Sequence, residues 1–265
     1  MSTKISVVIH TFNCENILRD CLERVKDFDE IVICDMYSDD KTLEIAKEYG
    51  CKIVMFERSG YAEPARNFAI QSASNDWVFV VDSDEWVKEP LKKQIRDFVE
   101  NPGEYTGARI VRRARDINDK TVYSDDTKLD IPEYLIRVFR KDDVDWPPEV
   151  HSSPIIKSGK IYDFPYTGEG VVLDHVMDFS WHDYIDKLNK YTDFEVEKLV
   201  RKGKKVNIYY TYFQSIWRTL EMFFFEGGYK QGIDGFIWCA VAGFYKFLSR
   251  AKYLEYLKKQ KQKMN

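Results

Sequence analysis

The sequence lacks the glycine-rich loops with which many nucleotide-binding proteins hold phosphate groups. Neither GxGxxG nor GxxxxGK[ST] follows the first apolar run of the chain. The phosphates of a nucleotide ligand would therefore need basic side chains and a metal ion, since no glycine-rich helix start is present to hold them. A sugar nucleotidyltransferase would carry a glycine-rich, arginine-containing loop at this point, and the segment HTFNCE is not such a loop.

Paired cysteines and long apolar runs are also missing. The five cysteines form no CxxC and show no metal-ligand spacing. Their odd number, and a start that shows no basic-then-apolar leader, lead us to expect a reduced protein in the cytoplasm. The longest apolar run, residues 235–245, has 11 residues and is too short to span a bilayer.

The chain has no strong overall charge. The net charge of −4 over 265 residues disfavours general nucleic-acid binding. Residues 246–265 contain seven basic residues and one acid, a net +6, which leaves −10 for the remainder. With 44% hydrophobic and 32% charged residues, the sequence predicts a globular protein of one large domain or one domain with an appendage.

Apolar runs alternate with amphipathic segments along the first 90 residues, which is typical of an α/β domain with a parallel sheet. We expect strands over 5–9, 30–34, 52–56 and 77–81. Helices are expected over 16–26, from the cap residues 38–40 to about 48, and over 61–73.

Acidic residues follow the strand Trp77–Val81 directly, in the segment WVFVVDSDEW. Ligands bind at the carboxyl ends of strands in open α/β sheets, and unpaired buried charge is costly. Asp82 and Asp84 are separated by a single residue, and we expect one to contact a sugar or ribose hydroxyl while the other holds a divalent cation. In the alternative interpretation these acids cap the next helix or lie in a solvated loop.

Two further polar positions lie near the same edge of the predicted sheet. Asp35 ends the second strand and is placed to accept hydrogen bonds from a base or ribose; alternatively it is an ordinary turn residue. Arg66, supported by Asn67, is a candidate for binding a diphosphate, and its alternative is a solvated helix residue.

The pattern changes after a predicted helix over 91–99. Strands joined by polar turns are expected over 106–113, 120–123, 134–140 and 154–162. The loop DWPPEVH places Glu149, which could take a proton from an acceptor hydroxyl, close to His151, a candidate metal ligand. His175 and His182 are expected to be structural.

The sequence predicts helices over 181–201, 212–225 and 233–261. Thirteen aromatic residues lie between 209 and 245, followed by the basic end of the chain. Aromatic and apolar faces beside a lysine-rich segment favour association with an anionic membrane surface. The alternative is a helical appendage on the sheet with a solvated tail. We therefore predict a nucleotide-sugar-binding domain over 1–178 and a helical extension over 179–265.

The segments ISVVIHTFNCE and DMYSDDKTLEIAKEYG, the triplet Ala65-Arg66-Asn67 and the DSDE after the fourth strand together resemble the family-2 glycosyltransferases. The resemblance covers about the first 90 residues. It implies the A-type glycosyltransferase fold, an α/β fold with a mostly parallel Rossmann-like sheet, a nucleotide-sugar donor, Mg²⁺ or Mn²⁺, and inversion of the anomeric centre. The WPPEVH block and the tail with GIDGF resemble the subgroup that adds sugars to bacterial lipopolysaccharide core.

The resemblance also implies roles in nucleotide binding. Thr11, Asn13 and Glu15 would line the nucleotide pocket, while Asp35 and Ser38 would read the base, with uridine favoured.

Further roles at the reacting groups follow from the same resemblance. Arg66 would approach the diphosphate, with Asn67 in support. Asp82 and Ser83 would face the ribose or sugar of the donor.

The metal and the base are assigned in the same way. Asp84 and His151 would hold the cation, because His151 matches the histidine of a Val-His-Glu element in the subgroup. Serine occupies position 152 in place of that glutamate, so Glu149 is our candidate base.

The expected reaction is a single displacement. An acceptor hydroxyl on a saccharide or lipid-linked glycan attacks the anomeric carbon, a carboxylate removes its proton, and the nucleoside diphosphate departs. The expected site of action is the cytoplasm or the inner face of the cytoplasmic membrane. A non-catalytic protein that only binds nucleotide-sugar or acts as a scaffold is the other open interpretation.

Overall fold

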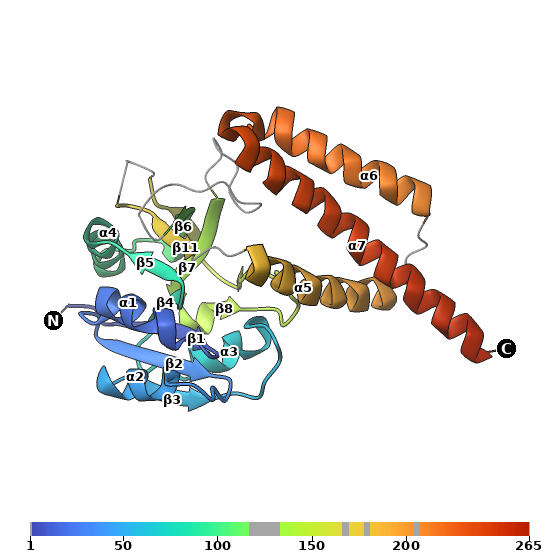
Figure 1. The fold of residues 1–265 in the computed structure, drawn as a ribbon. Helices are drawn as coiled ribbons and strands as arrows, with labels where there is room; N and C mark the ends of the chain where they lie inside the picture. Colours follow the sequence, from blue (N-terminus) through green and yellow to red (C-terminus); the bar gives the residue numbers. More distant parts are fainter. Residues whose placement is uncertain (1, 117–132, 166–169, 178–180, 204–206, 265) are drawn as a thin grey trace. The chain divides into compact units, whose positions relative to one another are not determined.

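The computed structural model describes residues 2–116, 133–165, 170–177, 181–203 and 207–264, drawn as a ribbon in Figure 1. The chain forms two compact units. The first comprises residues 1–115 and 133–177, and the second comprises 116–132 and 178–265. The strand predicted over 120–123 lies outside the described residues.

Strands and helices alternate in the first part of the first unit, which confirms the α/β prediction. The predicted elements are present, with ends shifted by one to three residues, because short apolar runs form buried strands and amphipathic segments form helices. In chain order they are β1 (Ile5–Thr11), α1 (Glu15–Val25), β2 (Glu30–Asp35), α2 (Thr42–Glu48), β3 (Lys52–Met55), α3 (Glu63–Gln71) and β4 (Trp77–Asp82).

The second part of this unit extends the same sheet. A short strand that the sequence did not predict, β5, precedes α4, and a 3-10 turn, η1, follows β7. The elements are β5 (Glu85–Val87), α4 (Glu89–Glu100), β6 (Tyr105–Asp116), β7 (Glu133–Arg140), η1 (Lys141–Asp143), β8 (Val144–Asp145), β9 (Ile155–Ile156), β10 (Lys160–Asp163) and β11 (Leu173–Met177).

The sheet has a parallel half and an antiparallel half. Among the described strands its order is β3-β2-β1-β4-β7-β6-β11-β5, with β10 paired to β6. Strands β3, β2, β1 and β4 are mutually parallel, whereas β7 runs antiparallel to β4 and to β6, and β11 runs antiparallel to β5. A separate two-stranded sheet pairs β8 with β9.

The parallel half is buried on both faces. Along β4, Phe79 belongs to a core cluster with α1 and α4, whereas its neighbours Val78 and Val80 belong to a second cluster with α3. This alternation follows from the two-residue period of a strand, and it explains why the sequence of β4 is apolar throughout.

Register brings the carboxyl ends of the parallel strands together. His10 on β1 pairs with Asp82 on β4, and Thr11 on β1 pairs with Asp35 on β2. The polar side chains that end three apolar strands therefore lie at one edge of the sheet.

The described part of the second unit is helical. Asn207 caps α6 by accepting hydrogen bonds from the N–H groups of Tyr209 and Tyr210. None of the described helices combines the length and the apolarity that crossing a bilayer requires. The elements are α5 (Trp181–Arg201), α6 (Ile208–Leu220), the π-helical turn η2 (Glu221–Phe225), the 3-10 turn η3 (Gly228–Gln231) and α7 (Gly232–Met264).

Candidate active site

A buried carboxylate, Asp35, organises the ends of β1 and β2. Its Oδ2 accepts hydrogen bonds from Thr11 Oγ1 at 2.8 Å and Ser38 Oγ at 2.6 Å, and its Oδ1 accepts one from Ser38 N–H at 2.7 Å. A carboxylate oxygen offers about two acceptor sites. Oδ1 of Asp35 can therefore accept a further donor, and three of the predicted pocket residues lie together.

The two loops that follow β1 and β2 are tied to each other. Asn13 N–H donates to Ser38 Oγ at 2.9 Å, and the Asn13 amide exchanges hydrogen bonds with Asp39. Asn13 and Tyr37 both have positive φ, at 47° and 59°. Non-glycine residues in this conformation concentrate at binding sites, where the surrounding structure holds them in place.

An exposed aromatic ring lies in the first of these loops. Phe12 is 46% exposed, and the guanidinium of Arg58 lies 4.5 Å from its centroid. Arg58 Nε also donates to the carbonyl of Met36 in the second loop. Arg58 therefore fixes both loops, a role that the sequence did not suggest.

Two predicted site residues, Glu15 and Asn67, make hydrogen bonds to other parts of the protein. Glu15 Oε2 accepts a hydrogen bond from Lys41 N–H at 2.9 Å, directly before the first residue of α2. The Asn67 amide bonds to Asp145 and to the backbone of Trp146. The carboxylate of Glu15 thus stabilises a helix start, and Asn67 fixes the loop after β8; their roles toward the nucleotide and the diphosphate stay predictions.

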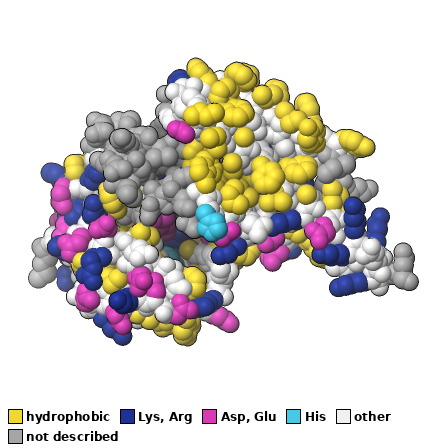
Figure 2. All heavy atoms as spheres, in the orientation of Figure 1, with side chains coloured by type: hydrophobic (Ala, Val, Ile, Leu, Met, Phe, Trp, Pro, Cys, Tyr) yellow, Lys and Arg dark blue, Asp and Glu magenta, His cyan; other side chains and the backbone are white. Residues whose placement is uncertain are grey.

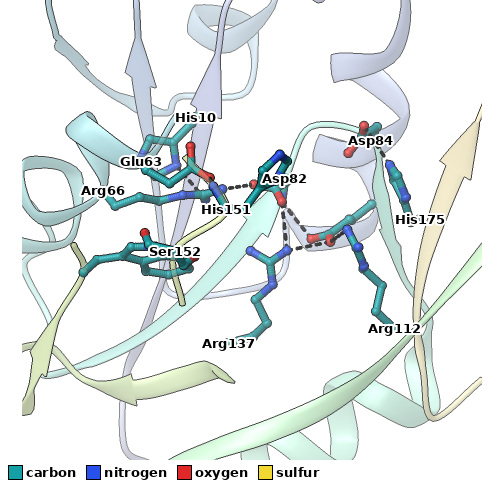
Figure 3. Close-up of polar contacts among 12 residues, drawn as sticks. His10, Glu63, Arg66, Asp82, Asp84, Arg112, Arg137, His151, Ser152 and His175 are labelled. Carbon is teal, nitrogen blue, oxygen red and sulfur yellow. Dashed lines mark hydrogen bonds and ion pairs between the residues drawn. The ribbon is translucent and has the colours of Figure 1, made fainter. Parts of the chain in front are cut away.

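Asp82, at the end of β4, is held between two arginines (Figure 3). Its Oδ1 lies 2.7 Å from Arg66 Nη2, and its Oδ2 lies 2.8 Å from Arg137 Nη2. Burial alone would raise the pKa of Asp82, but the charges of Arg137 and Arg66 outweigh it and hold the pKa well below the usual range. Asp82 is therefore ionised and orients both guanidiniums.

Glu85 is the second acid of this cluster and has the opposite pKa shift. It is fully buried, its Oε1 lies 2.8 Å from Arg137, and its Oε2 accepts a hydrogen bond from Asp82 N–H. Burial is the largest cause that raises its pKa. A third arginine, Arg112, has its Nη1 4.0 Å from Glu85 Oε1, so three guanidiniums lie close to the two carboxylates.

Arg66 is fixed on three sides. Besides Asp82, it contacts His10 Nδ1 at 3.1 Å, and its guanidinium lies 4.8 Å from the ring centroid of Trp146. Burial, followed by the charge of Arg66, lowers the pKa of His10 well below 6.5. Because arginine only donates, Nδ1 accepts and the proton of the neutral ring lies on Nε2.

The turn between β4 and β5 contains Ser83 and Asp84. Asp84 Oδ2 lies 3.1 Å from Nε2 of His175 on β11 (Figure 3). Burial would lower the pKa of His175, but the charge and hydrogen bond of Asp84 raise it. Among the described residues, no three His, Cys, Asp or Glu side chains are grouped around one point. The structure thus pairs Asp84 with His175, which the sequence had suggested to be structural.

The Asp84–His175 pair could supply two ligands to a divalent cation. The 3.1 Å between Asp84 Oδ2 and His175 Nε2 is a hydrogen-bond distance, and metal binding requires the deprotonated imidazole nitrogen. Water molecules and substrate oxygens commonly complete such a coordination shell.

The loop Pro147–Ser152 lies against the start of α3. His151 has a positive φ of 59°, and its N–H donates to Glu63 Oε1 at 2.9 Å (Figure 3). Glu149 is exposed, and its carbonyl accepts a hydrogen bond from Ser152 N–H. The loop that contains Glu149 therefore contacts Glu63, the first residue of α3; the roles of Glu149 as base and His151 as metal ligand stay predictions.

Sequence reasoning missed the arginines of β6 and β7. Arg137 interrupts the apolar strand Leu135–Phe139, and an ionic residue inside a buried strand is a signal for a buried partner. Arg113, on β6, lies 3.2 Å from the buried carboxylate of Asp174. Their partners are distant in the sequence, so only the fold shows which acids they neutralise.

Comparison with known proteins agrees with this arrangement. The family described as "Glycosyl transferase family 2" matches residues 6–153. The lipopolysaccharide core biosynthesis glycosyltransferase LpsC of Rhizobium meliloti is 29% identical over 255 residues, covering 94% of this chain and 91% of that protein. An uncharacterized glycosyltransferase of Rickettsia typhi, RT0209, is 28% identical over 262 residues, covering 95% of this chain and 87% of that protein.

A solved structure is also similar. The crystal structure of Staphylococcus aureus TarS residues 1–349 in complex with UDP is 20% identical and has a TM-score of 0.47, covering 73% of this chain and 66% of that one. The prediction of an A-type glycosyltransferase fold is confirmed by the family match together with the α/β architecture. Since the matching segment spans more than half of the sequence, this chain belongs to glycosyltransferase family 2.

Proposed function

We propose that this glycosyltransferase moves a sugar from a nucleotide-sugar, in particular a UDP-sugar, to a hydroxyl of a saccharide or lipid-linked glycan, with inversion at the anomeric carbon. The observation that carries the proposal is the gathering of Asp35, Asp82, Arg66 and Arg137 at one edge of the sheet. Asp35 offers a hydrogen-bond acceptor for a base, and Arg66 and Arg137 offer oriented positive charges for the phosphates that follow the base in a nucleotide.

The base would bind beside Asp35. Oδ1 of Asp35 can accept the N–H of a pyrimidine such as uracil, and Phe12, which follows the Asp35-bound Thr11, has a partly exposed ring. Aromatic faces favour stacking with planar rings. This pairing of a carboxylate with an aromatic ring supports a nucleotide and favours uridine.

The diphosphate would lie near the arginines of the Asp82 cluster. Arg66 and Arg137 are each held by Asp82, which fixes the direction of their guanidiniums. The buried Nε–H groups of both arginines have no partner among the described residues. A guanidinium that is already oriented loses little freedom on binding phosphate, so these residues can stabilise the departing diphosphate.

A divalent cation, Mg²⁺ or Mn²⁺, would be held by the carboxylate of Asp84 and the deprotonated imidazole of His175, which lie side by side. When bound, such an ion supplies positive charge at the diphosphate. Asp84 and His175 would hold it, and the arginines would share the neutralisation of the leaving group.

The chemical step would be a single displacement. The acceptor oxygen forms a bond to the anomeric carbon as the bond between that carbon and the diphosphate oxygen breaks, and the hydroxyl proton passes to a carboxylate. Glu149 remains our candidate base, and Glu63, which contacts the same loop, is its competitor. Either carboxylate has the chemistry that a general base needs.

The acceptor is proposed from the relatives. LpsC is named for lipopolysaccharide core biosynthesis, and TarS of Staphylococcus aureus, 27% identical over 173 residues, is named a poly(ribitol-phosphate) β-N-acetylglucosaminyltransferase. The first name concerns lipopolysaccharide core and the second a poly(ribitol-phosphate), and the match to TarS covers 61% of this chain and 30% of that protein. We therefore propose a lipopolysaccharide core or other cell-surface polysaccharide acceptor, reached from the cytoplasmic side of the membrane.

Release of free nucleotide from a panel of UDP- and GDP-sugars, with and without Mn²⁺, tests this proposal. Wild type should hydrolyse one donor slowly in a metal-dependent manner, and Asp84→Ala should lose this activity. The matched control is Asp20→Ala, because Asp20 is exposed on α1 and outside the site. Binding of a donor without turnover, even with acceptor glycans present, would favour the non-catalytic alternative; no binding of any donor would overturn the proposal.

A further inference from the structure

Helix α6 packs on α7 through small and hydroxyl-bearing side chains. Thr211 and Ser215 are buried, and a Cβ atom added at Gly243 of α7 would lie 2.6 Å from the carbonyl oxygen of Ser215. Ser215 Oγ donates to the Thr211 carbonyl, and Thr219 Oγ1 donates to that of Ser215, so these hydroxyls are satisfied within their own helix. Close approach through small residues is typical of helix pairs in lipid.

The opposite side of α6 and the adjoining turn η2 carry large apolar side chains exposed to solvent. A helix of a water-soluble protein normally buries this kind of face. Here the polarity is inverted, with hydroxyls inside and aromatic rings outside. The exposed aromatic side chains of α6 and η2 are Tyr209 (84%), Tyr210 (60%), Tyr212 (60%), Phe213 (62%), Trp217 (50%), Phe224 (60%) and Phe225 (77%).

These seven rings, with Ile216 and Leu220, form a surface that we call the aromatic face. Figure 2 shows hydrophobic side chains gathered over α6 and α7. An aromatic side chain has roughly 150–250 Å² of surface, so seven rings that are half to four-fifths exposed present roughly 700–1,000 Å². The largest apolar patch on a typical monomer is about 300–600 Å², and larger patches mark interaction surfaces.

Helix α6 itself carries little charge. Helix α6 contains no acidic residue, and its single arginine, Arg218, is paired with Glu221 and Glu226. Lys246 of α7 lines a shallow groove together with Tyr210, Phe213 and Trp217.

The end of α7 extends this positive charge. Lys258, Lys261 and Lys263 lie in its last two turns, and the only acid after residue 246 is Glu255, which pairs with Lys259. Lysines beside aromatic rings match the phosphates and the acyl boundary of an anionic bilayer.

From these observations we infer that the aromatic face of α6 and η2 inserts into the interface of an anionic lipid bilayer, with Lys246 and the lysines of the end of α7 on the headgroup phosphates. The 13 residues of α6 extend about 20 Å, less than the hydrocarbon thickness of about 30 Å. The helix therefore lies along the surface and does not span it. Tyrosine and tryptophan suit this position because their rings are apolar while their polar groups reach water.

A second copy of the chain is a poorer occupant. A two-fold contact through this face would bring the same patch against itself and place Lys246 near its symmetry mate. Helix α6 has no carboxylate to pair with it, and lysine is depleted in protein–protein interfaces. A bilayer of anionic lipid complements the same charges.

Co-sedimentation of the full chain with vesicles tests the inference. We expect binding to vesicles of phosphatidylcholine mixed with phosphatidylglycerol, and weak binding to phosphatidylcholine alone. Phe213→Ser should weaken binding roughly tenfold, the loss expected when one ring no longer inserts. The matched control is Phe68→Ser, because Phe68 is a partly exposed phenylalanine on helix α3 of the other unit and should leave vesicle binding unchanged.

A second variant tests the charge contribution. Replacing Lys258, Lys261 and Lys263 by glutamine should weaken binding to the anionic vesicles on the order of a hundredfold, and added salt should weaken wild type in the same way.

Three results would overturn the inference. The first is that wild type does not sediment with anionic vesicles at low salt. The second is that wild type and Phe213→Ser bind the vesicles equally. The third is that wild type forms a dimer and binds no vesicles, and that Phe213→Ser makes this dimer dissociate. Hydrolysis of the donor, measured in parallel without vesicles, reports separately on the proposed function, because the aromatic face belongs to the second unit.

Discussion

Replacing Arg137 by methionine removes the cation that Asp82 and Glu85 share. Arg137 lies in the apolar strand β7 with only 5% of its side chain exposed, and its Nη2 is 2.8 Å from both carboxylates. Methionine keeps an apolar stem of similar length and loses the charge. Breaking a buried ion pair by deleting one partner costs about 3–5 kcal/mol. Arg66 still neutralises Asp82, so we expect the unfolding free energy to fall by about 3 kcal/mol.

Adding Glu85→Gln to Arg137→Met tests whether the unpaired charge of Glu85 causes the loss of stability. Glutamine can still accept the hydrogen bond from Asp82 N–H through its oxygen, but it carries no charge to leave unpaired. We expect the second substitution to restore about 1–2 kcal/mol, a coupling that neighbouring residues of one network commonly show.

Urea unfolding followed by tryptophan fluorescence measures both variants, since Trp77 and Trp146 are buried in the same unit. Arg109→Met is the matched control, because Arg109 on β6 pairs with Asp163 on the surface, where ion pairs contribute about 0–1 kcal/mol. If Arg137→Met lowers the unfolding free energy as little as Arg109→Met does, the buried Asp82–Arg137–Glu85 cluster does not stabilise the fold.

Three further predictions concern the other site residues. Folding lowers the pKa of His10, so below about pH 6.5 the unfolded chain binds a proton that the folded chain does not, and the unfolding free energy falls as the pH drops. The slope contributed by His10 is at most about 1.4 kcal/mol per pH unit. Urea titrations at several pH values should show that His10→Asn loses this slope. If Glu149 is the base, Glu149→Gln should lower kcat about 10²–10⁴-fold with little change in donor KM, whereas a loss confined to Glu63→Gln would transfer that role to Glu63. His175→Ala should weaken Mn²⁺ binding at least tenfold in a calorimetric titration, and unchanged Mn²⁺ affinity would exclude His175 as a ligand.

The elements of the first 90 residues could be predicted because each has a local signal. Apolar runs such as Trp77–Val81 can only be buried strands at their length, and the polar residues that end them, Asp35 and Asp82, meet at one edge in a parallel sheet. Local pattern and topology give the same answer there.

The partners of those residues could not be predicted in the same way. Arg137 is 55 residues from Asp82, and His175 is 91 residues from Asp84, so the pairs form only when β7 and β11 enter the sheet. No periodicity encodes that register. The partner of Asn67 could not be predicted either, because the local sequence does not determine whether an amide on a helix contacts a ligand or a neighbouring loop.

In the second unit, the spacing of apolar residues predicts the helices but not which face of a helix is buried. The spacing of aromatic residues after Tyr209 predicts a helix with one apolar face, but it does not state what that face meets. The structure shows small residues such as Ser215 against α7, so the rings point outward. Packing partners, which depend on the whole unit, decide this orientation.

Binding of UDP to wild type and to Asp35→Asn, measured by isothermal titration calorimetry in the presence of Mn²⁺, tests the central claim most directly. If the ends of β1 and β2 form the nucleotide site, wild type binds UDP and Asp35→Asn binds it at least about tenfold more weakly, because a buried hydrogen bond to a charged acceptor contributes about 1.5–3 kcal/mol. Asp20→Asn, with its exposed carboxylate, should bind as wild type does. Wild type that does not bind UDP, or equal affinity in a folded Asp35→Asn, would contradict the account.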